Sequence, residues 1–109
     1  MNREAFNNLV ERRISLTKVT LVKKGQEYSS ETDVFHNFKS ATGLSFHNTP
    51  EKVGWEFMVK HLQSIKDIMD IVDNEGRLPS VEMIEEKFGD AINYLILIEG
   101  ILKSKLTDK

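Results

Sequence analysis

Residues 49–105, TPEKVGWEFMVKHLQSIKDIMDIVDNEGRLPSVEMIEEKFGDAINYLILIEGILKSK, contain the two strongest helix signals of the chain and decide its fold. The first helix begins at Thr49-Pro50-Glu51, where a capping hydroxyl precedes a proline at the first helical position and an acid in the first turn. Asn74-Glu75-Gly76 ends this helix. Between these limits, residues recur at helical spacing to about Asp73, namely Val53, Phe57, His61, Ile65, Ile68 and Val72.

The second helix of this stretch begins after Pro79, with Ser80 as its N-cap and Glu82 in its first turn. It runs to about Lys105. Its apolar face comprises Ile84, Phe88, Ala91, Ile92, Leu95, Ile98 and Leu102.

The first half of the chain adds one long helix and one short helix. Residues 2–24 have apolar residues at roughly helical spacing up to Gly25, although β-branched residues between Ser15 and Lys23 leave a strand as an alternative. Residues 26–32 have loop composition. A short helix over residues 34–42, capped by Thr32 or Asp33 and stopped by Gly43, would point Phe35 and Phe38 inward. The sequence therefore predicts one domain, residues 1–109, folded as a small all-α bundle of three long helices plus one short helix.

Composition excludes several classes of protein. The chain has 109 residues, a net charge of −2 and no cysteine, which argues against a binder of duplex nucleic acid and against disulfides or thiolate metal sites. The N-terminus lacks the apolar core of a signal peptide, and the longest apolar stretch, residues 94–98, is too short to span a bilayer. We therefore expect a cytoplasmic protein. A bundle of this size buries a modest fraction of its surface, so we also expect a homo-oligomer.

Two polar lines are candidates for a functional face. Glu82, Glu86, Asp90 and Asn93 lie on one side of the last helix, and Glu56, Lys60, Ser64 and Asp67 follow the same spacing on the helix before it. Carboxylate and amide oxygens on one helix suit a hard cation such as Mg²⁺. The alternative is a solvated helix face, and we favour that alternative for Glu82. If the two helices pack antiparallel, the lines would face each other across a cleft.

The segment before the short helix mixes cations, a tyrosine and an asparagine. Lys24 could hold a phosphate as a point charge, and Tyr28 could stack on a base. The histidines do not have zinc spacing, and His61 is expected to be a satisfied core residue.

The order of these residues resembles the nucleotide modification associated domain family of phages, which is similar to the all-α, MazG-like nucleotide pyrophosphatases. The resemblance rests on KKGQEYSSETDVFHNF (residues 23–38) and EEKFGDAINYLILIEGIL (residues 85–102). It implies an oligomeric helical bundle that handles a nucleotide in a polar cleft, with Glu86 and Asp90 as metal-binding acids. The nucleotide-binding residues that follow are Lys24, Tyr28, Asp33, Asn37, Lys60, Asp67, Asn93 and Tyr94.

One departure from that family keeps three functions open. MazG-like enzymes carry two glutamates three residues apart on the earlier helix, and WEFMVKHLQSIKDIMD (residues 55–70) has no such pair. The sequence therefore predicts a phage-type nucleotide-binding protein, either a Mg²⁺-dependent pyrophosphohydrolase or a non-catalytic protein that sequesters a nucleotide defence signal. The third alternative is a structural interaction module.

Overall fold

The computed structural model describes residues 1–24 and 33–107, without the side chain of Lys24, and within them it contains helices but no strand. The elements in chain order are α1 (Arg3–Lys18), the π-helix η1 (Val19–Lys24), α2 (His36–Ala41), α3 (Pro50–Glu75) and α4 (Val81–Thr107). The predicted all-α fold of three long helices and one short helix is confirmed. The predicted helix end at Gly25, the loop over residues 26–32 and the cap by Thr32 lie outside the described residues.

The ends of α3 and α4 form where the sequence predicts them, with one exception. Gly76 ends α3 in the left-handed region at φ 67°, and the Ser80 hydroxyl accepts a hydrogen bond from the Met83 amide at 3.1 Å. The exception is the cap of α3, because the Thr49 side chain accepts no capping hydrogen bond. Pro50 sets the first turn through its fixed φ angle instead.

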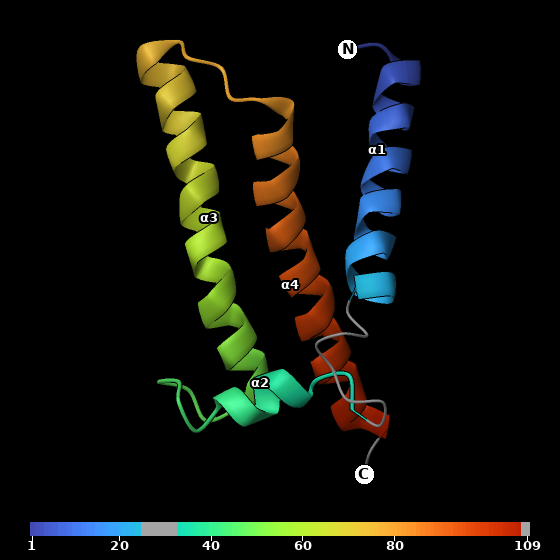
Figure 1. Ribbon diagram of the computed structural model, residues 1–109, viewed down its shortest axis with the longest axis vertical. Helices are drawn as coiled ribbons and strands as arrows, with labels where there is room; N and C mark the ends of the chain where they lie inside the picture. Colours follow the sequence, from blue (N-terminus) through green and yellow to red (C-terminus); the bar gives the residue numbers. More distant parts are fainter. Residues whose placement is uncertain (25–32, 108–109) are drawn as a thin grey trace.

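The three long helices lie side by side in one layer, and α2 crosses the lower ends of α3 and α4 (Figure 1). α3 and α4 form an antiparallel hairpin, and α1 runs beside α4 in the same direction. The molecule measures 48 × 31 × 24 Å, so the layer is thin in one dimension. This arrangement leaves both broad sides of the hairpin available for other contacts.

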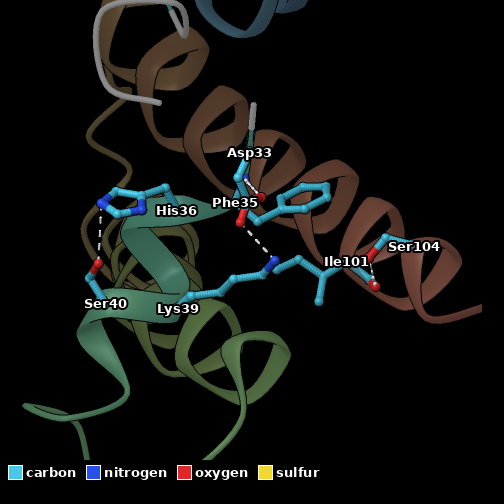
Figure 2. Close-up of polar contacts among 7 residues, drawn as sticks. All are labelled: Asp33, Phe35, His36, Lys39, Ser40, Ile101 and Ser104. Atoms are coloured by element: carbon cyan, nitrogen blue, oxygen red, sulfur yellow. Dashed lines mark hydrogen bonds and ion pairs between the residues drawn. The ribbon is translucent and has the colours of Figure 1, made fainter. Parts of the chain in front are cut away.

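Two glycines let α2 approach this layer closely. A Cβ atom at Gly54 would lie 3.0 Å from the Ile98 side chain and 3.5 Å from Phe38, and one at Gly100 would lie 2.7 Å from Phe35. Figure 2 shows the Phe35 ring reaching towards α4 beside Ile101. Both aromatic residues therefore point inward, as the sequence predicts.

The first helix changes its hydrogen-bonding pattern near its end. α1 is α-helical to Lys18 and continues as the π-helix η1 through Val19–Lys24, so the alternative of a strand there is wrong. Valine and threonine crowd an α-helical backbone at χ1, and this segment carries three of them in its first four residues, VTLV. π-turns of this kind are rare and short.

Arginine side chains hold α1 against α4. Arg12 forms a two-pronged ion pair with Glu85, with distances of 2.5 and 2.9 Å, and Arg13 donates to the Glu85 carbonyl at 3.2 Å. The Arg13 guanidinium lies over Gly89, where a Cβ atom would approach it to 2.7 Å. No residue of α1 is fully buried, so α1 packs against α4 through side chains that stay partly exposed.

The apolar core is small for the described length of chain. Its buried members are Val53, Met58, Ala91 and Ile101, all from the α3–α4 hairpin. The α3–α4 hairpin is therefore the stable frame on which the candidate site is built.

No helix among residues 1–24 and 33–107 is long and apolar enough to cross a membrane.

Candidate functional site

The antiparallel hairpin brings the two predicted polar lines to the same side of the layer. His61 pairs with Asp90, Gly54 faces Ile98, and Glu51 pairs with Lys105, which together fix the register of α3 against α4. By this register, Lys60 lies level with Asn93 and Asp67 lies level with Glu86. On each helix, the polar line is displaced from the α3–α4 seam in the same rotational sense. In antiparallel helices, equal rotations of that kind lead to the same side of the pair.

A histidine, an acid and a tyrosine form the centre of this site. His61 Nδ1 lies 3.4 Å from Asp90 Oδ2, and the His61 ring stacks on Tyr94 with centroids 5.3 Å apart and planes at 28°. Phe57 and Phe38 meet Tyr94 edge-on at 6.4 and 6.3 Å. Burial first, and then the charge of Asp90, raise the pKa of Tyr94 above its usual value. The phenol is therefore neutral at physiological pH.

Asn93 carries a polar atom that the described residues leave unsatisfied. Its Oδ1 atom is buried and accepts no hydrogen bond from residues 1–24 or 33–107. Leaving a buried acceptor without a partner destabilises a fold by about 1–3 kcal/mol. An unmet acceptor of this kind marks a place where a ligand or a water molecule could donate a hydrogen bond.

The remaining predicted residues on these two helices are more exposed. Lys60 lies on the surface of α3, and Asp67 accepts a hydrogen bond from Gln63 at 2.8 Å. The Glu86 side chain is 65% exposed, with Lys87 3.9 Å away. These three predicted residues provide charges that are open to solvent and to a ligand.

The two predicted metal ligands lie one helical turn apart on α4. Glu86 and Asp90 would supply two carboxylates, and Mg²⁺ in proteins is often held by one or two carboxylates together with substrate phosphates. Among the described residues, no group of three or more histidine and acidic side chains is placed to hold a metal ion. One Asp90 oxygen also faces His61. The residues therefore fit an ion that arrives with a phosphate better than a resident ion.

Two acids of the polar lines have structural partners. Glu56 of α3 accepts a hydrogen bond from Ser45 and lies 3.8 Å from His47, so it fastens the segment before α3. Glu82 lies in the first turn of α4 and is exposed, in agreement with the solvated helix face that the sequence favours for it. Neither acid is needed to build the centre of the site.

The front segment reaches the site through α2. Hydrogen bonds from Lys39 at 2.7 Å and from the Phe35 amide at 3.0 Å lower the pKa of Asp33 (Figure 2). The predicted cap of this helix by Asp33 is wrong, because α2 begins at His36 and its N-cap, Phe35, has no side-chain capping hydrogen bond. Asn37 is exposed on α2, next to the Phe38 that contacts Tyr94. Tyr28 and the side chain of Lys24 lie outside the described residues, so their predicted roles stay predictions.

His61 and Phe38 are members of the site that the sequence did not assign to it. The pattern put His61 on the apolar stripe of α3, and only the register against Asp90 shows that it belongs to a polar pair.

A surface depression at the N-terminal end of α1 is lined by Met1, Asn2, Arg3 and Phe6, none of which belongs to the predicted site.

The fold and the site define a small all-α helical protein with a polar face on an antiparallel hairpin. Comparisons with models of protein families, with characterised proteins and with solved structures found no match to this chain. The residues of the site are therefore the basis for its function.

Proposed function

We propose that this protein binds a nucleotide, or a small molecule derived from one, on the polar face of the α3–α4 hairpin. The observation that carries the proposal is the buried, unsatisfied Oδ1 atom of Asn93, next in the chain to Tyr94 and level with Lys60. A base or sugar offers the donor that this acceptor lacks. The resemblance to the phage nucleotide modification associated domain family supports the same ligand class. We also propose that the protein is cytoplasmic and, if a phage encodes it, acts in the cytoplasm of the host cell.

Each residue has a role that follows from its chemistry. Lys60 holds a phosphate oxygen as a point charge, and Asn93 accepts from the base or the sugar. The Tyr94 and His61 rings form one wall of the site. Asp67 can accept from a ribose hydroxyl. Lys24, Tyr28, Asp33 and Asn37 would approach from the front segment, which α2 anchors against Tyr94.

Mg²⁺-dependent pyrophosphohydrolysis is one form of this proposal. Glu86 and Asp90 would hold a Mg²⁺ ion that arrives bound to the nucleotide phosphates, and the ion would neutralise charge on the reacting phosphate. Asp90 would have to exchange its contact with His61 for one with the ion. No described residue is assigned a further part in hydrolysis.

Binding without hydrolysis is the second candidate, and the His61–Asp90 pair favours it. One oxygen of Asp90 lies 3.4 Å from His61, and while this contact is kept that oxygen is not available to a metal ion. A protein of this kind would sequester a nucleotide defence signal and so act against host defence. The remaining alternative is an interaction module, in which the two polar lines are a surface between copies of the chain rather than a ligand site.

Ligand-dependent thermal unfolding tests the binding proposal. Purified protein is heated with nucleoside triphosphates, mononucleotides and cyclic nucleotides, with and without Mg²⁺. A ligand at 100 times its Kd stabilises the folded state by about 2.7 kcal/mol, which raises the Tm by roughly 10 °C at this size. No shift with any nucleotide overturns the proposal. Pyrophosphate release in the presence of Mg²⁺ separates the enzyme from the sequestering protein.

Two variants with matched controls locate the site. Asn93→Leu should abolish the ligand-dependent shift while leaving the unliganded Tm unchanged or higher, because it removes an unsatisfied acceptor. Asn74→Leu, at the exposed end of α3, should keep the shift. Lys60→Ala should weaken binding of phosphorylated ligands, whereas Lys52→Ala, also exposed on α3, should not.

A further inference from the structure

The side of the layer away from α2 carries large apolar residues that the described chain leaves uncovered. On α4, Phe88, Leu95 and Leu102 are 38%, 52% and 51% exposed and lie seven residues apart. On α3, three apolar residues repeat at the same interval and are 52%, 40% and 51% exposed, namely Trp55, Leu62 and Met69. A seven-residue apolar repeat is the pattern of a seam between packed helices.

Both repeats lie on the same side of the hairpin. At about 100° per residue, each is rotated roughly 80–90° from its own α3–α4 seam and in the same sense, which in antiparallel helices leads to one side. The polar lines are rotated in the opposite sense. α2 packs over Gly100, which shares the polar side of α4. On α1, the apolar residues Phe6, Val10 and Ile14 are also exposed, by 45%, 39% and 46%.

The molecule exposes more surface than a compact monomer of its mass. The accessible surface is 8297 Å², about 2,100 Å² more than the roughly 6,200 Å² expected for a compact monomer of this mass. The radius of gyration is 16.3 Å, against about 13 Å for a compact chain of this length. A standard interface buries about 800 Å² per partner. The excess belongs to the whole chain, and it is larger than the area that one partner buries in such an interface.

We propose that this apolar face, centred on Phe88 and Leu95 of α4 and Leu62 of α3, is covered by the same face of a second copy of the chain. Domains are built from at least two packed layers, and one flat layer of three helices supplies only one of them. A two-fold pair places like faces together and completes the second layer. The location of the interface rests on the homo-oligomer expected above. It does not depend on nucleotide binding, because the polar face lies on the other side.

The oligomeric mass of the full-length protein tests this proposal. Light scattering coupled to size exclusion should give at least twice the chain mass of 12.5 kDa. Leu95→Glu should reduce the mass to that of one chain with the helical circular dichroism retained. Leu78→Glu, a matched change at a 78% exposed site in the connection between α3 and α4, should keep the assembly. A monomeric wild type, or an assembly that Leu95→Glu leaves intact, overturns the proposal.

A second measurement decides the matter if Leu95→Glu fails to fold. The sequence has no cysteine, so Leu95→Cys and Leu78→Cys each introduce one thiol. In a monomer, both sites are open and maleimide labels them at comparable rates. In the proposed dimer, labelling at position 95 should be at least tenfold slower than at position 78. Equal rates in the assembled protein overturn the proposal. Nucleotide-dependent thermal shifts are read separately, so either proposal can fail alone.

Discussion

The substitution Ile101→Ala tests where the stability of this small core is concentrated. Ile101 is 2% exposed in α4, and the change deletes three carbon atoms from a packed position. Transfer alone is worth about 0.8 kcal/mol per buried methylene, and the cavity that remains adds to it. We expect a loss of about 3 kcal/mol in the free energy of unfolding. This is a large share of a total that for small domains is about 5–15 kcal/mol.

Ile96→Ala is the matched control, because it makes the same change in the same helix at a residue that is 41% exposed. We expect a loss below about 1 kcal/mol there. Urea unfolding followed by circular dichroism at 222 nm, at one fixed protein concentration, gives both values. At about 4 °C or more per kcal/mol, Ile101→Ala should also lower the Tm by roughly 12 °C or more. Equal losses for the two variants would refute a core centred on Ile101.

Three further predictions concern α1 and the candidate site. Gly89→Ala places a Cβ atom 2.7 Å from the flexible end of Arg13, so amide exchange in α1 should accelerate. The free energy of unfolding should change by less than about 1 kcal/mol, because alanine favours a helix more than glycine does. Tyr94 has a raised pKa, so its neutral form contributes stability below pH 10 that is lost as pH rises through the raised value. Tyr94→Phe should remove this loss of stability at alkaline pH, measured by urea unfolding, and the matching tyrosinate absorbance at 295 nm. Asp90→Asn breaks a partly exposed contact with His61, which should lower the free energy of unfolding by less than about 1 kcal/mol. Any part of the nucleotide-dependent rise in Tm that requires Mg²⁺ should disappear. If that part persists, Asp90 is not a metal ligand.

Local signals in the sequence were sufficient for the helices. Pro50, Ser80 and Gly76 each act within one turn of the backbone, so their effect can be read without knowing the fold. Thr49 has the extended backbone of an N-cap residue, but its side chain makes no capping hydrogen bond, and the orientation of one side chain is not fixed by the local sequence. The π-helical continuation of α1 depends on crowding among neighbouring side chains, which a periodic pattern does not describe.

The pairing of the helices was beyond the sequence. His61 reads as a core residue by period, and its contact with Asp90 exists only because α3 and α4 meet in one register. Glu85 likewise reads as an acid of the first turn, and only the position of α1 gives it Arg12 as a partner. That ion pair lowers the pKa of Glu85. Periodicity identifies the face of one helix, whereas these contacts depend on two.

The most informative difference concerns the apolar face of α4. The sequence treats Phe88, Leu95 and Leu102 as core, and the structure leaves all three exposed by more than a third. An apolar stripe predicts that its residues are buried, but it does not predict whether the same chain or another chain buries them. If a second copy covers this stripe, assembly uses one side of the layer and leaves the polar face, with the exposed Lys60, on the other. Assembly and ligand binding would then be separable, so Leu95→Glu should lose the dimer while a folded monomer keeps its nucleotide-dependent rise in Tm.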